Sequence, residues 1–367
     1  METIRVGIIG VGQIGKSHLR NYTTKVPAAR IVAAADVDEN ELTKVCDQFG
    51  IQHRYRDFRE LLQRDDIDAV DVCLHNNYHA PVTIEALRAG KHVYCEKPMA
   101  GSYVDAAAMF ETARQTGRQL SIQLSTLFSR ECKIAKRLID AGRLGRVYHA
   151  HSTGYRRRGR PFVDGYGTAS FVKKRIASGG ALYDMGVYHI AQMLYLLGCP
   201  PVERISGKIY QELPMDERRR RDSGYDVEEM GLGFVRFADG LTLDIIECWA
   251  IHLSPLESSF ILGSLGGLRL HPLSFHTSLE DIESNVTFEA ESTDVRWRRL
   301  NENEEAFDSA QQHWIAALQG RVNLLPTAEL ALQTMLISEG IYLSDARGCE
   351  VSAEEVRQRS VSTAVQL

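Results

Sequence analysis

The sequence lacks the features that mark several classes of protein. Its seven cysteines are scattered and odd in number, with no C-x-x-C pair and no Cys/His spacing typical of zinc, so we expect neither a disulfide framework nor a metal site. No apolar run approaches the roughly 20 residues that a membrane span needs. A strand-like run begins at residue 4, with no signal peptide before it. We therefore expect a reduced, soluble, cytoplasmic protein with no membrane partner.

The charge is nearly balanced. The chain has 43 basic and 48 acidic residues, a net charge of -5, which gives no indication of a nucleic-acid partner. A length of 367 residues with 44% hydrophobic residues suggests about two domains of roughly 100–200 residues each.

What the chain does contain is a regular alternation of strands and helices over residues 1–124. Strands are predicted at residues 4–9, 31–35, 68–74, 91–97 and 119–124, and the helices between them indicate a parallel sheet. After a helix at residues 130–141, strand-like runs follow one another at 146–153, 230–237, 241–251 and 258–262, which suggests an antiparallel sheet. Helical segments at residues 307–320 and 327–346 close the chain.

A glycine-rich loop follows the first strand. Gly10, Gly12 and Gly15 form a G-x-G-x-x-G pattern between a strand and a helix, the context that this dinucleotide-binding signature requires. Gly10 would allow the tight turn, Gly12 a close approach of the pyrophosphate, and Gly15 close packing of helix on strand. Gln13 and Ile14 begin the helix, whose N-terminal N–H groups favour phosphate.

The second strand ends in an acid at the position expected for a ribose ligand. Asp36 lies 21 residues beyond Gly15, close to the roughly 20 residues typical of this fold. Its carboxylate would accept hydrogen bonds from ribose hydroxyls and repel a 2′-phosphate, and residues 37–39 include no arginine. We therefore predict NAD as the cofactor, with NADP the less favoured alternative.

A later strand, at residues 91–97, ends in Lys97. Ligands in open α/β folds bind at the carboxyl ends of the strands, so this lysine is expected beside the dinucleotide. Burial or a nearby cation can lower a lysine pKa, which would let Lys97 share a proton with a substrate oxygen. The alternative is a surface lysine paired with Glu96.

Two motifs resemble the Gfo/Idh/MocA family of glucose–fructose oxidoreductases and inositol dehydrogenases. The first is Glu96-Lys97-Pro98, and the second is the stretch at residues 179–189, in which a glycine pair is followed by D-x-G-x-Y-H. The resemblance covers almost the whole chain. It implies an α/β Rossmann domain at residues 1–124 and an α+β domain at 125–367 with a large, mostly antiparallel open sheet for substrate binding and oligomerisation. A homodimer or homotetramer is expected.

The resemblance also implies site residues. The catalytic positions would be Lys97, Asp184, Tyr188 and His189, which would also contact substrate. Besides the glycine loop and Asp36, the cofactor would contact Leu74, Asn76, His79, Glu96 and Lys97. Many members have histidine four residues after the aspartate, where this chain has Tyr188, and His189 comes one later.

On a regular α-helix, Tyr188 would share a face with Asp184, and His189 would point about 100° away from Tyr188. Tyr188 is therefore the preferred proton relay, although a core tyrosine and an offset role for His189 both stay open. Asp184 would accept a hydrogen bond from substrate or orient Lys97; the alternative is a helix cap. His79 would flank the nicotinamide or be a structural histidine.

Basic residues gather in two places near the expected pocket. Arg156 and Arg158 belong to one group and Lys174 to another, and they could bind an anionic group on a sugar. The alternative is a solvated loop or an oligomer contact.

Three functions are compatible with these residues. The first is an NAD-dependent dehydrogenase that moves a hydride between nicotinamide and a ring hydroxyl or ketone of a sugar, glycoside or cyclitol. The second is a glycoside hydrolase that oxidises C3 transiently and expels the aglycone by elimination. The third is a non-catalytic NAD-bound sensor, against which the retained Lys97 and Asp184 argue.

Overall fold

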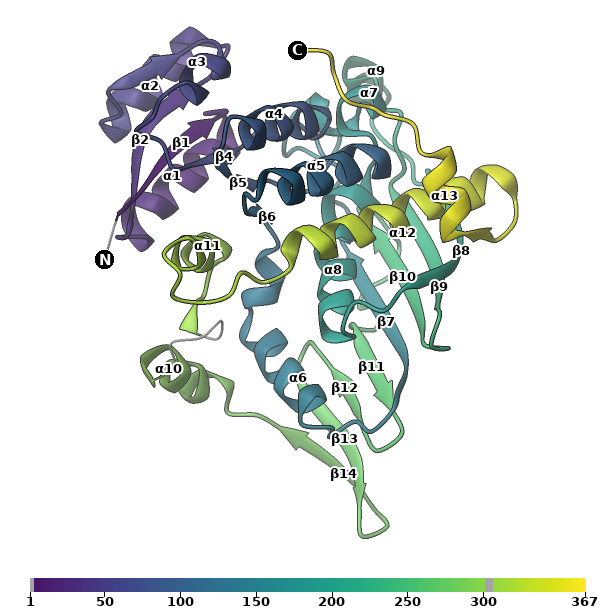
Figure 1. The fold of residues 1–367 in the computed structure, drawn as a ribbon. Coiled ribbons are helices and arrows are strands. Elements are labelled where there is room, and N and C mark those ends of the chain that lie inside the picture. Colours follow the sequence, from purple (N-terminus) through teal and green to yellow (C-terminus); the bar gives the residue numbers. More distant parts are fainter. Residues whose placement is uncertain (1–2, 301–305) are drawn as a thin grey trace.

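The computed structural model describes residues 3–300 and 306–367 and contains two sheets (Figure 1). The first sheet is parallel and six-stranded, in the order β3-β2-β1-β4-β5-β6, which is the Rossmann order. This confirms the Rossmann prediction. Its strands are β1 (Ile4–Ile9), β2 (Ala29–Ala35), β3 (His53–Tyr55), β4 (Ala69–Val72), β5 (His92–Cys95) and β6 (Leu120–Ile122).

Helices flank this sheet, and their ends follow the capping residues. Asp38 accepts a hydrogen bond from the Glu41 N–H, and Ser102 from the Asp105 N–H, while Gly117 ends its helix at φ 63°. Local side-chain and glycine caps therefore mark the ends of these helices. The helices are α1 (Gln13–Lys25), α2 (Glu39–Phe49), α3 (Phe58–Leu62), α4 (Asn76–Arg88) and α5 (Tyr103–Thr116).

The second sheet has nine strands in the order β14-β13-β12-β11-β7-β10-β9-β8-β15. Its neighbours are antiparallel except β7 and β10, which run parallel, so the predicted mostly antiparallel sheet is confirmed. The sheet comprises β7 (Val147–Tyr155), β8 (Val202–Tyr210), β9 (Met230–Phe237), β10 (Thr242–Cys248), β11 (Phe260–Gly263), β12 (Gly267–Arg269), β13 (Ser274–Leu279), β14 (Ile282–Thr287) and β15 (Val351–Ser352).

The remaining helices connect and cover this sheet. They include a π-helical turn, η3, and two short 3₁₀ helices, η1 and η2. They are η1 (Ser125–Phe128), α6 (Arg130–Asp140), η2 (Ala169–Val172), α7 (Lys174–Ala177), η3 (Leu182–Gly186), α8 (Val187–Leu196), α9 (Glu217–Ser223), α10 (Ala290–Leu300), α11 (Ala310–Leu318), α12 (Thr327–Arg347) and α13 (Ala353–Arg359).

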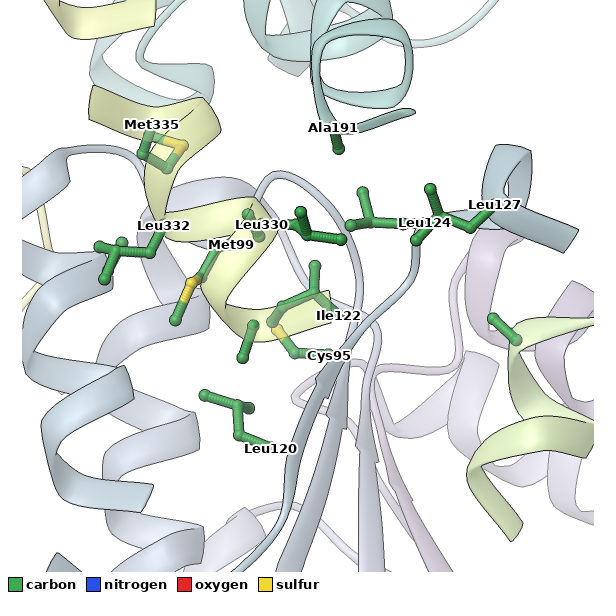
Figure 2. Packing of buried hydrophobic residues seen from close by; sticks show 14 of the residues in the cluster. Cys95, Met99, Leu120, Ile122, Leu124, Leu127, Ala191, Leu330, Leu332 and Met335 are labelled. Carbon is green, nitrogen blue, oxygen red and sulfur yellow. The ribbon is translucent and has the colours of Figure 1, made fainter. Parts of the chain in front are cut away.

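Helix α12 joins the two halves into one core. It packs on β8, α8, α5 and β6, and the Thr327 hydroxyl at its N-terminus accepts the Ile122 N–H at 3.0 Å. Figure 2 shows Leu330, Leu332 and Met335 of this helix among buried side chains of the Rossmann half, including Ile122. One hydrophobic cluster thus spans both sheets. The predicted boundary at residue 124 lies between β6 and η1 and stays a prediction.

The C-terminal segment returns to the Rossmann half after α13 (Figure 1). The Thr363 N–H donates to Asp105 of α5, and the Val365 N–H donates to the Asn77 carbonyl of α4. Among the helices of the described ranges, none is long and apolar enough to cross a membrane.

Candidate active site

A cavity of about 1000 Å³ lies over the carboxyl ends of β1, β2 and β4. Of the residues predicted to contact the cofactor, Gly10, Gly12, Gln13, Ile14, Asp36 and Leu74 line it. The position is the switch point of the sheet, where β1 lies between β2 and β4. This part of the predicted cofactor site therefore converges on one cavity.

The glycines of this cavity have the environments that a dinucleotide loop requires. A Cβ at Gly12 would meet nothing within 4 Å, so the backbone is open to a ligand. A Cβ at Gly15 would overlap the Gly10 carbonyl, so this glycine allows the helix to pack on the loop. Helix α1 has no side-chain cap, which leaves its first N–H groups available to phosphate. The residues present therefore fit a dinucleotide.

Asp36 lines this cavity, and two backbone N–H groups fix the position of its carboxylate. One carboxylate oxygen accepts the Val11 N–H at 2.8 Å and the other accepts the Asp38 N–H at 2.9 Å. The cavity is also lined by Arg56, which follows β3 and lies 3.9 Å from Glu39. Sequence reasoning considered only residues 37–39 and missed Arg56, because the β2–β3 pairing that brings it here is a tertiary contact.

The second half of the chain also contributes to the cavity. Thr168, Ser170 and Phe171, in and beside η2, line it together with Leu367. The Phe171 ring meets the His75 ring edge-on at 6.4 Å between centroids. Residues from both halves of the chain thus line the cavity. The glycine motif alone does not predict the contribution of the second half.

Two residues predicted to contact the cofactor have structural partners instead of lining this cavity. The Asn76 side chain donates to the Ala177 carbonyl at 2.7 Å and so ties α4 to α7. His79 is fully buried, and its ring nitrogens face the carbonyl oxygens of Pro98 and Leu74 at 2.7 and 3.0 Å. This geometry favours the structural alternative for His79.

Lys97 follows β5, one strand beyond the cavity along the same sheet edge. Its ammonium donates to the Asp184 carboxylate at 3.0 Å and to the Asp184 carbonyl at 2.7 Å. Both side chains are largely buried, 13% and 17% exposed. The alternative of a surface lysine paired with Glu96 is wrong. The Lys97 side chain is largely buried, and it is the backbone N–H of Lys97, not the ammonium, that donates to the Glu96 carboxylate.

Charge balance decides the ionisation of this pair. Burial alone would lower the pKa of Lys97, but Asp184, with smaller effects of Tyr188 and Glu96, outweighs burial and raises the pKa above its ordinary value. Burial would raise the pKa of Asp184, but Lys97, Arg156 and the Trp249 indole lower it. The expectation of a lowered lysine pKa is therefore wrong: the site contains an ammonium and a carboxylate.

Asp184 lies in η3, a π-helical turn, whereas Tyr188 and His189 lie in the regular helix α8 that follows. A π-helical turn bonds residues five apart, not four. Tyr188 lies with its ring under the Lys97 ammonium, 4.8 Å from Nζ to the ring centroid, and burial raises its pKa to about 12. His189 lies against β7 and β10, where its Nδ1 is 3.0 Å from both carboxylate oxygens of Glu247.

The predicted basic residues separate into different places. The Arg156 guanidinium lies 3.6 Å from the Asp184 carboxylate and contacts the Tyr166 hydroxyl. It therefore joins Lys97, Asp184 and Tyr188 in one group, which we call the Lys97–Asp184 cluster. Arg158 is exposed and pairs with Asp164, and the Lys174 side chain is exposed at the start of α7. Of these three basic residues, Arg156 alone joins the Lys97–Asp184 cluster in the described part of the chain.

Sequence reasoning missed three contributors to the cluster. The Trp249 indole N–H donates to Asp184 at 2.9 Å, and Glu247 pairs with His189. Beneath the cluster, His18 of α1 contacts Asp71 at 2.9 Å and Glu96 at 2.8 Å, in nearly complete burial. A histidine three residues after the last glycine of the loop was the one available signal for this network.

The His18 network carries a buried positive charge. Burial would lower the pKa of His18, but Asp71 and Cys73 raise it well above its ordinary value. Burial would raise the pKa of Glu96, but His18 and Lys97 lower it. Within the described ranges, His18, Asp71 and Cys73 form the group close enough to hold a metal, but both ring nitrogens of His18 already contact carboxylates.

Two family models match the chain. Residues 4–124 match the GFO_IDH_MocA model, described as "Oxidoreductase family, NAD-binding Rossmann fold", and residues 133–269 match the "GFO/IDH/MocA C-terminal domain".

Curated relatives are distant. The chain is 29% identical to D-glucoside 3-dehydrogenase of Escherichia coli (strain K12) over 283 residues, 75% of this chain and 79% of that protein. It is 28% identical to scyllo-inositol 2-dehydrogenase (NAD(+)) of Bacillus subtilis (strain 168) over 245 residues, 66% of each.

Among solved structures, levoglucosan dehydrogenase in complex with NADH and levoglucosan superposes with a TM-score of 0.79 over 96% of this chain and 100% of that one. At 21% identity this likeness establishes the fold alone.

Proposed function

The chain belongs to the Gfo/Idh/MocA oxidoreductase family, and we propose that it is an NAD-dependent dehydrogenase of a neutral sugar, glycoside or cyclitol. It would move a hydride between the nicotinamide and a ring hydroxyl or ketone. The observation that carries this proposal is the buried Lys97–Asp184 pair, one strand along the sheet edge from a cavity suited to a dinucleotide.

The cofactor would lie with its pyrophosphate at the start of α1 and its adenosine ribose at Asp36. The bound NAD would supply the hydride acceptor. Asp36 favours NAD over NADP because its carboxylate is held toward the ribose end by two backbone N–H groups and would repel a 2′-phosphate. Arg56 lines the same end, so the preference rests on which of these two charges lies nearer the 2′ position.

Lys97 would act on the substrate oxygen as a hydrogen-bond donor and electrostatic stabiliser. Its ammonium has three N–H groups, and two of them are directed to Asp184. The third would donate to the reacting oxygen and stabilise the negative charge that develops there as the hydride leaves. Asp184 would hold the ammonium in this orientation, with Trp249 fixing the carboxylate in turn.

Oxidation of a hydroxyl also releases a proton, which needs an acceptor with a suitable pKa. Lys97 and Asp184 are fixed in their charged states, and the pKa of Tyr188 is about 12. His189 is partly exposed and its Nε2 has no hydrogen-bond partner within the described residues. His189 is therefore our choice over Tyr188 as the proton acceptor.

The charges around the site suit a neutral substrate. Arg156 lies against Asp184, Lys97 is paired with the same carboxylate, and Arg158 is paired elsewhere. Each of these three cations thus has a carboxylate partner, although Lys97 and Arg156 share Asp184. An anionic substrate, considered from the basic groups in the sequence, is the less favoured reading.

The relatives support the substrate class. Their names include a D-glucoside 3-dehydrogenase and a scyllo-inositol 2-dehydrogenase, and a structural neighbour contains levoglucosan. We further propose that the face of the nine-stranded sheet opposite α8 and α12 forms the contact of a homodimer or homotetramer, because large apolar side chains on its strands, Tyr148, Leu279 and Ile282, are exposed.

The test is a substrate screen with purified protein and NAD. Neutral hexoses, methyl and aryl glycosides and inositols are each assayed for NADH formation and, with aryl glycosides, for aglycone release. NADH formation without stoichiometric aglycone release supports the proposal. Aglycone release without net NADH would identify the NAD-dependent hydrolase instead, and NAD binding with neither reaction would favour a sensor.

A further inference from the structure

Glu247 lies fully buried under the proposed proton acceptor. Its side chain is 0% exposed, and both carboxylate oxygens lie 3.0 Å from Nδ1 of His189. Within the described residues, the hydrogen bonds and the ion pair of the Glu247 carboxylate are all made with His189. A buried carboxylate with a single partner is costly to maintain unless that partner is protonated on the facing nitrogen.

The neighbouring strand is shaped to admit this contact. In the parallel β7–β10 ladder, Gly154 lies opposite Glu247. A Cβ at Gly154 would overlap the Glu247 carboxylate and the His189 ring, and something would have to move. The backbone there needs no positive φ, since Gly154 is absent from the positive-φ glycines. The glycine is therefore required for space and not for backbone conformation.

The same two strands also support Asp184. Two residues beyond Glu247, Trp249 donates to Asp184, and two residues beyond Gly154, Arg156 lies 3.6 Å from Asp184. Residues two apart on a strand share a face and are separated by roughly 7 Å. The Glu247–His189 pair thus lies one step along the sheet from Asp184, a span that one sugar ring could bridge.

We propose that Glu247 is a positioning residue for the reaction: it holds the Nδ1–H tautomer of His189 and directs the free Nε2 toward the substrate hydroxyl. This inference rests on the proposed function. During oxidation, the hydroxyl O–H bond breaks and its proton passes to Nε2, while the C–H electron pair leaves as hydride to the nicotinamide. The carboxylate stabilises the imidazolium that forms, and the proton is later released to solvent.

Charged groups around the ring define the expected pH behaviour. Glu247 of β10 and Arg156, which follows β7 directly, both act on it, and Asp184 lies on the preceding turn. Burial would lower the pKa of His189, but Glu247 outweighs both burial and Arg156 and raises it. Without the carboxylate, the protonated ring loses its stabilising partner.

The test compares Glu247→Gln with wild type, using the most active sugar from the screen. We expect kcat to fall at least about tenfold, and less than the roughly 10²–10⁴-fold that His189→Ala should cause. KM should change little, because Glu247 does not touch substrate. The acid limb of the kcat profile should move to lower pH. Unchanged kcat and an unchanged profile would overturn the proposal.

Glu229→Gln is the matched control. Glu229 is equally buried and paired with Arg160 at 2.9 Å, but lies outside the cluster. The Glu229→Gln variant should be less stable than wild type, but the acid limb of its kcat profile should stay at the same pH. Gly154→Ala is a second variant in case Glu247→Gln fails to fold; it should lower kcat with NAD affinity retained. Normal turnover in a folded Gly154→Ala protein would contradict the proposal.

A spectroscopic measurement separates failure of this inference from failure of the proposed function. Histidines are labelled with ¹⁵N, and the His189 signal is assigned by its loss in His189→Asn. If no sugar is oxidised, the dehydrogenase proposal fails, but the ring can still be titrated. A lower His189 pKa in Glu247→Gln supports the positioning role, and an unchanged pKa and tautomer overturn it.

Discussion

Replacement of Lys97 by methionine tests the central ion pair without leaving a large cavity. The change keeps an unbranched apolar side chain and removes the ammonium, with its two contacts to Asp184 and its position 4.8 Å over the Tyr188 ring. If Lys97 stabilises charge on the reacting oxygen, turnover should fall by about 10²–10³, the typical cost of removing one hydrogen-bond donor to a developing oxyanion.

The same variant should lose stability, and the structure sets the scale. Breaking a buried ion pair costs about 3–5 kcal/mol when one charge is left uncompensated. Asp184 keeps the Trp249 indole at 2.9 Å and Arg156 at 3.6 Å, so we expect the lower end of that range. Urea unfolding at neutral pH measures it. NAD affinity should change by less than about threefold, because Lys97 does not line the cavity.

Lys133→Met is the matched control. Lys133 is also buried and pairs with Asp294 at 3.2 Å, with side-chain exposures of 6% and 4%, but it lies between α6 and α10. The Lys133→Met variant should lose about as much stability as Lys97→Met and keep the turnover of wild type. Turnover of Lys97→Met within about threefold of wild type, measured at saturating NAD, would refute the assigned role.

Three further changes probe other parts of the account. Asp36→Ala should weaken NAD binding and raise relative use of NADP about tenfold or more, a ratio measured from kcat/KM with each cofactor; a wild type that already prefers NADP tenfold would contradict the reasoning. Gly15→Ala should abolish NAD binding and lower the Tm, because a Cβ would overlap the Gly10 carbonyl; calorimetry that shows normal binding would contradict this. His18→Asn should cost about 3–5 kcal/mol by leaving two buried carboxylates unpaired. Because the pKa of His18 is raised in the folded protein, the stability that its charge contributes is complete below about pH 6.5 and is lost as pH rises through the folded pKa. The difference in unfolding free energy between wild type and His18→Asn, measured in urea, should therefore become smaller as pH rises.

Much of the Rossmann half could be predicted because its signals are local. The strand, loop and helix around Gly10, the caps at Asp38 and Ser102, and the lysine at the end of β5 each follow from neighbouring residues. The kind of sheet in the second half was predicted, but five of its nine strands, β8, β12, β13, β14 and β15, were not assigned. Polar residues such as those of Ser274–Leu279, and the glycine at the start of Gly267–Arg269, obscure the alternation that marks a strand.

The site residues that escaped prediction depend on tertiary pairing or on irregular backbone. Glu247 and Trp249 are positioned by the parallel pairing of β7 and β10, and Arg56 by the pairing of β2 and β3. The sequence could also not show the π-helical turn that precedes α8, in which Tyr188 and His189 lie. The charge of Lys97 was misjudged because its partner lies 87 residues away, so sequence could show burial but not the opposing carboxylate.

The most direct test of the account is whether a ring C–H hydrogen passes to the cofactor. Ring-deuterated D-glucose, methyl glucoside and inositol are incubated with the protein and NAD, and the isolated NADH is analysed by mass spectrometry. The account predicts deuterated NADH from at least one of them with wild-type protein, and about 10²–10³-fold less with Lys97→Met. Folded, NAD-binding wild-type protein that yields no deuterated NADH from any of these neutral substrates would contradict it.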